Sequence, residues 1–158
     1  MRLSPRPVNS SVISLPLRRI VNGCLGADSF ENDDASDWLA DFCVDPDKEL
    51  ISNALSTVAE MHSGEHLEAP ECSVGLAAAE VAAALKGAPN PNMPDEAKQC
   101  VVNFKIKSDP SLVSLAVKAV ERIKKNSELK ELWDESENSH EWYSAVGDLE
   151  ARLRKLIA

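Results

Sequence analysis

The 158-residue sequence has few aromatic residues and no long hydrophobic run. Aromatic residues make up 4% of the chain, although hydrophobic residues as a whole make up 44%. A core must therefore be built mainly from aliphatic side chains and alanine. No stretch approaches the roughly 18 apolar residues that a membrane-spanning helix needs. A glycine-rich phosphate loop and a nucleophile elbow are also missing. We therefore expect no membrane segment and no cofactor, and the signals for catalysis are weak.

Basic residues are outnumbered by acidic ones. The chain has 17 lysines and arginines against 26 aspartates and glutamates, for a formal net charge of −9. Sequence-independent nucleic-acid binding needs a basic surface, so this balance argues against it. The same charge favours a basic protein as partner.

Cysteine is sparse and shows no paired spacing. Its four positions, Cys24, Cys43, Cys72 and Cys100, are tens of residues apart with no CxxC motif. We interpret these residues as small buried hydrophobes in a reducing compartment, which predicts a cytoplasmic protein. A disulfide framework is the alternative.

Charge is distributed unevenly along the chain. Residues 1–27 contain four arginines and no acid, together with three prolines and no lasting periodicity. We predict that residues 1–21 form a disordered basic extension; an organelle transit peptide is the minority alternative. The remaining residues, 22–158, have the length of a single domain with one core.

The segment from Cys72 to Gly87, CSVGLAAAEVAAALKG, is apolar almost all round when placed on a helix. Such a helix is normally buried on several faces, and its alanines let neighbouring backbones approach closely. Cap signatures and amphipathic spacing predict further helices at 33–43, after Asp45-Pro46, at 95–104, after Asp109-Pro110, after Ser127, and from an Asn138–Glu141 capping box onward. The sequence predicts an all-α fold: a single-domain bundle of about six to seven helices around 72–87.

Acidic residues are concentrated just before and within the first predicted helix. Residues 28–49 carry a net charge of −8. Within that block Asp33, Asp37 and Asp41 follow one another at i,i+4, where like charges destabilise a helix. The helix dipole offsets this repulsion only in the first turn. Asp37 and Asp41 must be favoured by something else: backbone N–H groups of the Gly23–Ser29 loop, an intrachain base, a cation or a basic partner.

Three blocks of the sequence form a recognisable series. The first is a Phe-x-Asn-Asp-x-Ala-x-Asp pattern beginning at Phe30; the others are Leu67–Leu85 and Asn126–Glu135. Together they resemble a bacterial family of uncharacterised proteins, domain of unknown function 4259. The resemblance implies a small bacterial cytosolic protein without an assigned reaction. We expect these motif residues to be structural: Phe30, Asn32, Asp33, Asp37, Trp38 and Glu80.

Two further candidate sites each have two readings. Glu80 is an acid among the alanines of 72–87. It could act in catalysis as a general acid or base, or it could join two helices by pairing with a basic side chain such as Arg122. We favour the second interpretation. His62 and His66 have i,i+4 metal-ligand spacing, but Gly64 lies between them at a predicted helix end. We therefore expect no metal site there.

These observations leave two hypotheses for function. The first is a non-enzymatic interaction module that binds a basic partner through Asp33, Asp37 and Asp41; an inhibitor or immunity-type protein against a nucleic-acid-acting toxin is one concrete version. The second is a metal-assisted hydrolase using Asp33, Asp37, Glu80 and a histidine. The second requires Asp37 and Glu80 to line one cleft with His62 or His66. Oligomeric state does not follow from the sequence.

Overall fold

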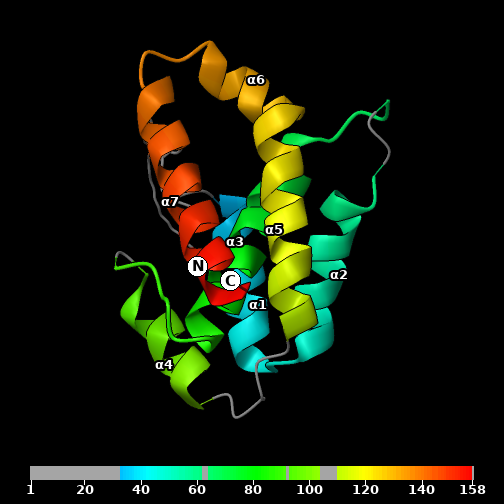
Figure 1. Ribbon diagram of the computed structural model, residues 1–158. Coiled ribbons are helices and arrows are strands. Elements are labelled where there is room, and N and C mark those ends of the chain that lie inside the picture. Colours follow the sequence, from blue (N-terminus) through cyan, green and yellow to red (C-terminus); the bar gives the residue numbers. More distant parts are fainter. Residues whose placement is uncertain (1–32, 62–63, 92, 104–109, 158) are drawn as a thin grey trace, which may run out of the picture.

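A computed structural model describes residues 33–61, 64–91, 93–103 and 110–157, which form seven α-helices and no strand (Figure 1). The prediction of an all-α bundle is confirmed. No helix within these ranges combines the length and apolarity needed to cross a bilayer. The predicted disorder of residues 1–21 lies outside the described residues. The helices are α1 (Asp33–Val44), α2 (Lys48–Ala59), α3 (Ala69–Leu85), α4 (Asp95–Asn103), α5 (Pro110–Lys125), α6 (Glu128–Asp134) and α7 (Ser139–Ile157).

The central helix of the bundle is α3, which packs against each of the other six helices. In Figure 1 it lies in the middle of the molecule, between α7 and α5. Side chains are buried all round α3, as its sequence predicts. The buried set is Cys72, Ser73, Gly75, Leu76, Ala77, Ala78, Ala79, Glu80, Val81, Ala82 and Ala83. Burial on every face means that this helix organises the whole core.

Small residues on α3 allow its neighbours to come close. A Cβ atom added at Gly75 would lie only 2.9 Å from Cγ2 of Val58 on α2. Real Cβ atoms do not approach a carbon atom so closely, so α2 can occupy this position only because residue 75 has no side chain. Five alanines are also buried on this helix: Ala77, Ala78, Ala79, Ala82 and Ala83.

The N-terminus of α3 differs from the predicted boundary. The helix begins at Ala69 rather than Cys72, with Pro70 in the first turn. Glu128, the first residue of α6, accepts a 2.9 Å hydrogen bond from the backbone N–H of Ala69, and its own N–H donates to the carbonyl of Leu67. Locally, the carboxylate of Glu71 accepts a 3.3 Å hydrogen bond from the N–H of Glu68, so this turn is capped both by a neighbouring residue and by a side chain distant in sequence.

The other cap predictions have mixed outcomes. Ser127 caps α6, because its Oγ accepts a 3.1 Å hydrogen bond from the N–H of Lys130. The Asn138–Glu141 capping box is not formed as predicted. The N–H of Asn138 donates instead to Oγ of Ser136 at 3.1 Å, and α7 begins at Ser139.

Ala78→Glu should abolish cooperative folding. Ala78 is fully buried on α3, and burying an unpaired carboxylate there costs several kcal/mol against a total stability of about 5–15 kcal/mol. Ala151→Glu is the matched control, because Ala151 is exposed on α7. Thermal melts followed by circular dichroism compare the two. A cooperative transition in Ala78→Glu near the wild-type temperature would contradict the burial of α3.

Glu128→Ala should destabilise the protein more than Glu128→Gln, because only the amide can still accept from Ala69. The hydrogen bond from the Ala69 N–H, and then His66, hold the pKa of Glu128 below its usual value of 4.5. The stabilisation is therefore present above that value and is lost as the pH falls through the lower folded-state pKa. Urea midpoints at pH 7 and below pH 4 measure this. Equal midpoints for wild type and Glu128→Ala at pH 7 would rule out the cap.

Candidate functional site

The acidic residues of α1 lie on its exposed side. Asp33, Asp34, Asp37 and Asp41 are all exposed, whereas the opposite side buries three apolar residues in the core. We call these four aspartates the acidic stripe. The helix contains no basic residue. Within the described residues none of the four carboxylates forms an ion pair.

Asp37 is the member of the acidic stripe whose ionisation is perturbed. Partial burial raises the pKa of its carboxyl group above the usual 3.8, and the charges of Asp33, Asp34 and Asp41 raise it further. Repulsion within the stripe, the basis of the sequence hypothesis, is thus present, although burial is the larger cause. In the part of the chain that the structure describes, no hydrogen bond to this carboxylate offsets the repulsion. The Gly23–Ser29 loop, the predicted source of backbone donors, lies outside the described residues.

Trp38 packs against the core from the side of α1. It is half-buried, and its ring stacks on that of Phe42 with centroids 5.5 Å apart and planes 12° from parallel. Phe42 is fully buried. Trp38 thus helps to hold α1 against the bundle while the acidic stripe faces outward. Phe30 and Asn32 lie outside the described residues.

Glu80 joins two parts of the bundle, but not through the residue named from the sequence. Its side chain is 1% exposed, and its Oε1 lies 2.9 Å from Nη2 of Arg152 on α7. These two atoms form an ion pair whose angles fall outside hydrogen-bond geometry. The other oxygen, Oε2, accepts a 2.6 Å hydrogen bond from Asn90. The base that pairs with Glu80 is Arg152, 72 residues later in the sequence and on α7, and not Arg122.

Arg122 binds backbone carbonyl groups. Its guanidinium donates to the backbone carbonyls of Met61 and Glu65, and its Nε donates to the carbonyl of Asn126. It therefore ties the end of α5 to the connection between α2 and α3. The sequence identified the right class of partner for Glu80 and the wrong residue, because spacing along the chain does not reveal which helix lies opposite.

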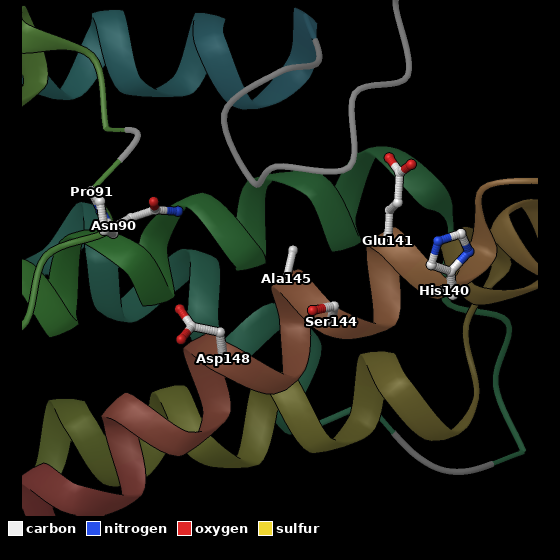
Figure 2. A pocket seen from close by; sticks show the side chains of 7 residues that line it. All are labelled: Asn90, Pro91, His140, Glu141, Ser144, Ala145 and Asp148. Carbon is white, nitrogen blue, oxygen red and sulfur yellow. The ribbon is translucent and has the colours of Figure 1, made fainter.

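An open pocket of about 500 Å³ lies beside the Glu80–Arg152 ion pair. Figure 2 shows that α7 supplies one side and the segment after α3 the other. Asn90 connects the pocket to the ion pair, because it lines the first and hydrogen-bonds the second. The lining residues are Asn90, Pro91, His140, Glu141, Ser144, Ala145 and Asp148. Sequence reasoning missed this pocket, although the i,i+4 spacing of its α7 residues could have indicated a shared face.

His140, Ser144 and Asp148 in this pocket are the residue types of a hydrolytic triad. A triad needs hydrogen bonds that link the nucleophile to the histidine and the histidine to the acid. No such bond joins these three residues within the described structure, and Oδ2 of Asp148 accepts from Arg152 at 2.8 Å. The pocket contains polar groups that can bind a ligand but no assembled nucleophile.

The residues of the metal-assisted hydrolase hypothesis are not brought together in the described chain. Glu80 is about 16 Å along the α3 axis from the end near which His66 lies, and the exposed His66 contacts Glu128 at 3.4 Å. Asp37 is exposed on α1, whereas Glu80 is buried. Among the described residues no three His, Cys, Asp or Glu side chains are placed to hold a metal ion. His62 lies outside the described residues.

Arg152→Met should cost about 3–5 kcal/mol, because it leaves the buried Glu80 carboxylate without its counter-ion. Asp148→Asn is the control: this carboxylate binds the same guanidinium but is 62% exposed, so its loss should cost about 0–1 kcal/mol. Glu80→Gln should be milder than Arg152→Met, because the amide oxygen still accepts from Asn90. Denaturant titrations give the three values.

A double-mutant cycle provides the decisive comparison for this ion pair. The Glu80→Gln/Arg152→Met double variant should be less destabilised than the sum of the two single variants, by about 0.5–3 kcal/mol. Additive losses would show that the two side chains do not stabilise one another.

Comparison with known proteins identifies a family for this chain and no individual relative. Searches of curated proteins and of solved structures found no match to the chain. A family model described as a domain of unknown function matches residues 23–145, which include α1 to α6, the acidic stripe, Glu80 and Asn90. Arg152, the partner of Glu80, lies beyond the matched range. Because the match covers most of the sequence, the chain belongs to the DUF4259 family.

Proposed function

We propose that this protein is a non-enzymatic interaction module that presents the acidic stripe of α1 to a basic partner. The observation that carries the proposal is the row of four exposed aspartates on α1, in which the carboxyl group of Asp37 is crowded by the other three. Its charge is opposed by burial and by three neighbouring aspartates, and the described residues offer it no counter-ion. A basic surface that docks on α1 would remove this unfavourable energy.

The charge pattern elsewhere supports the same reading. The acids of α5 and α7 are interleaved with bases: Glu150 pairs with Lys124 and Arg154, and Arg154 also contacts Glu121. The acidic stripe has no such interleaving. A helix surface with alternating charges is typical of a face exposed to solvent. An extended block of charges of one sign instead produces a local electric field that steers an oppositely charged partner.

A rigid support makes the acidic stripe suitable for recognition. Three core residues of α1, Ala35, Leu39 and Phe42, are buried, and α1 packs directly against α3. The carboxylates are therefore held on a fixed helical face, and little conformational entropy is lost when a partner binds. An inhibitor that covers the basic surface of a nucleic-acid-acting toxin is one concrete form of this function.

Affinity capture from the source organism tests the proposal. The full chain is immobilised as wild type and as Asp33→Asn/Asp37→Asn/Asp41→Asn, and bound proteins are compared at low and high salt. We expect a basic protein that the triple variant fails to retain, with binding weakened by salt because the attraction is electrostatic.

The matched control removes three negative charges from a surface away from α1. Glu131→Gln/Glu135→Gln/Glu137→Gln changes three exposed acids, one within α6 and two just after it, so its net charge equals that of the α1 variant. This control should retain the partner. Equal loss in both variants would mean that total charge is responsible, and retention by both would refute the role of the acidic stripe.

Stability of the single variants separates a partner role from a structural one. Because the folded-state pKa of Asp37 is raised, its ionisation opposes folding: the cost is absent below pH 3.8 and complete above the folded-state pKa. Asp37→Asn should therefore raise the stability at pH 7, by about 0.2–0.5 kcal/mol for each like-charge pair removed. Asp41→Asn should raise it less, because Asp41 lies at the end of the stripe.

Thermal melts at pH 7 and pH 3 provide this measurement, and the gain should vanish at the lower pH. Destabilisation of Asp37→Asn alone, by about 1–3 kcal/mol, would assign Asp37 to hydrogen bonds within the fold. Destabilisation of both variants would overturn the interaction role for these residues.

A further inference from the structure

Two cysteines from distant parts of the sequence meet where α1 packs on α4. Cys43 is near the end of α1 and Cys100 lies within α4, and the two helices are in contact. Both thiols are free and half-buried, and the side chains are within hydrogen-bonding contact of each other. The sequence interpretation of the cysteines as small buried hydrophobes therefore does not describe this half-buried pair.

The surroundings of Cys43 disfavour the thiolate form of its side chain. Burial, the hydrogen bond and charge interaction with Cys100, and the charge of Glu96 together raise the pKa of Cys43 to about 12. Cys43 therefore stays protonated at neutral pH and is a poor first nucleophile. Cys100 is the member of the pair that we expect to attack an oxidant first.

We propose that Cys43 and Cys100 are a modification site: they form a reversible intramolecular disulfide by exchange with a small-molecule disulfide. This inference goes beyond the proposed interaction function and does not depend on it. It rests on the placement of two accessible thiols, one from each helix, against one another.

The reaction balances in two exchange steps. The Cys100 thiolate attacks one sulfur of the small disulfide, which forms a mixed disulfide and releases one thiolate. Cys43 then attacks Sγ of Cys100, its proton passes to solvent, and the second small thiol leaves. The protein loses two protons and two electrons, and the small-molecule disulfide is reduced to two thiols.

The geometry favours the second step. A disulfide requires sulfur atoms about 2.05 Å apart and Cβ atoms about 3.8 Å apart. Side chains already in hydrogen-bonding contact need only a short approach, and the helices that carry them pack directly. Because the resolving thiol is held beside the mixed disulfide, its effective concentration exceeds that of a competing small thiol.

Cys72 serves as the internal comparison. It is fully buried in α3, and burial raises the pKa of its thiol to about 11. Its hydrogen-bonding neighbours are Ser127 and Leu129, not another cysteine within the described residues. We therefore expect Cys72 to remain a free thiol under conditions that oxidise the pair.

Treatment of the full chain with oxidised glutathione, followed by peptide mass mapping without reduction, tests the proposal. We expect one peptide linked through Cys43 and Cys100, a loss of two hydrogens from the intact mass, and no retained glutathione. In Cys43→Ser the resolving thiol is absent, so one glutathione should remain on Cys100. In Cys100→Ser, adduct formation at Cys43 should be much slower.

Thermal stability provides a second measurement that needs no variant. A cross-link within the native fold should raise the melting temperature of the oxidised wild type above that of the reduced protein. A fall would show that the bond forms only in an opened state and would overturn the proposal. Retention of glutathione on Cys100 in the wild type, no reaction at either thiol, or pairing of either thiol with Cys24 would also overturn it.

Discussion

Burial of α3 on every side is the constraint on which the rest of the bundle depends. A helix that contacts all six others must present a small side chain wherever a neighbouring backbone comes close. Gly75 meets this requirement against Val58, and the alanines from Ala77 to Ala79 meet it elsewhere. Since the chain has few aromatic residues, close helix packing takes the place of bulky side chains in filling the core.

Polar contacts fix how α3 is oriented among its neighbours. Near the N-terminal end, Glu128 binds the backbone of Ala69; farther along, Glu80 pairs with Arg152 and Asn90. A buried ion pair is weak evidence for stability, because apolar residues of similar size often serve equally well. Apolar contacts are non-directional, however, so they define the rotation and height of α3 less sharply than polar contacts do. Charged and hydrogen-bonding groups at defined positions penalise a rotation or shift of the helix, which gives the acid in this otherwise apolar segment a structural role.

Local patterns predicted the helices better than the contacts between them. The apolar stripe of α1 and the Ser127 cap followed from spacing along the chain, and both are present. The start of α3 was placed three residues too late, although Pro70 and the contact between Glu68 and Glu71 mark it locally. The base for Glu80 was misassigned because it lies on α7. The pocket at Asn90 and the Cys43–Cys100 contact likewise require knowledge of which helices face each other. Periodicity along the sequence specifies which side of a helix is buried, but it does not specify which other helix packs against that side.

The acidic stripe is the feature that fold stability explains least. A carboxylate that stabilises a helix lies in the first turn or beside a base. Asp33 satisfies the first condition, but Asp37 and Asp41 satisfy neither among the described residues. Asparagine or serine would avoid the repulsion at either exposed position without emptying the core. At neutral pH the repulsion among these charges is relieved when a positive group approaches, whether from a basic partner or from residues of this chain outside the described ranges. Variants that alter charge on α1 alone therefore report on function more directly than changes in the core.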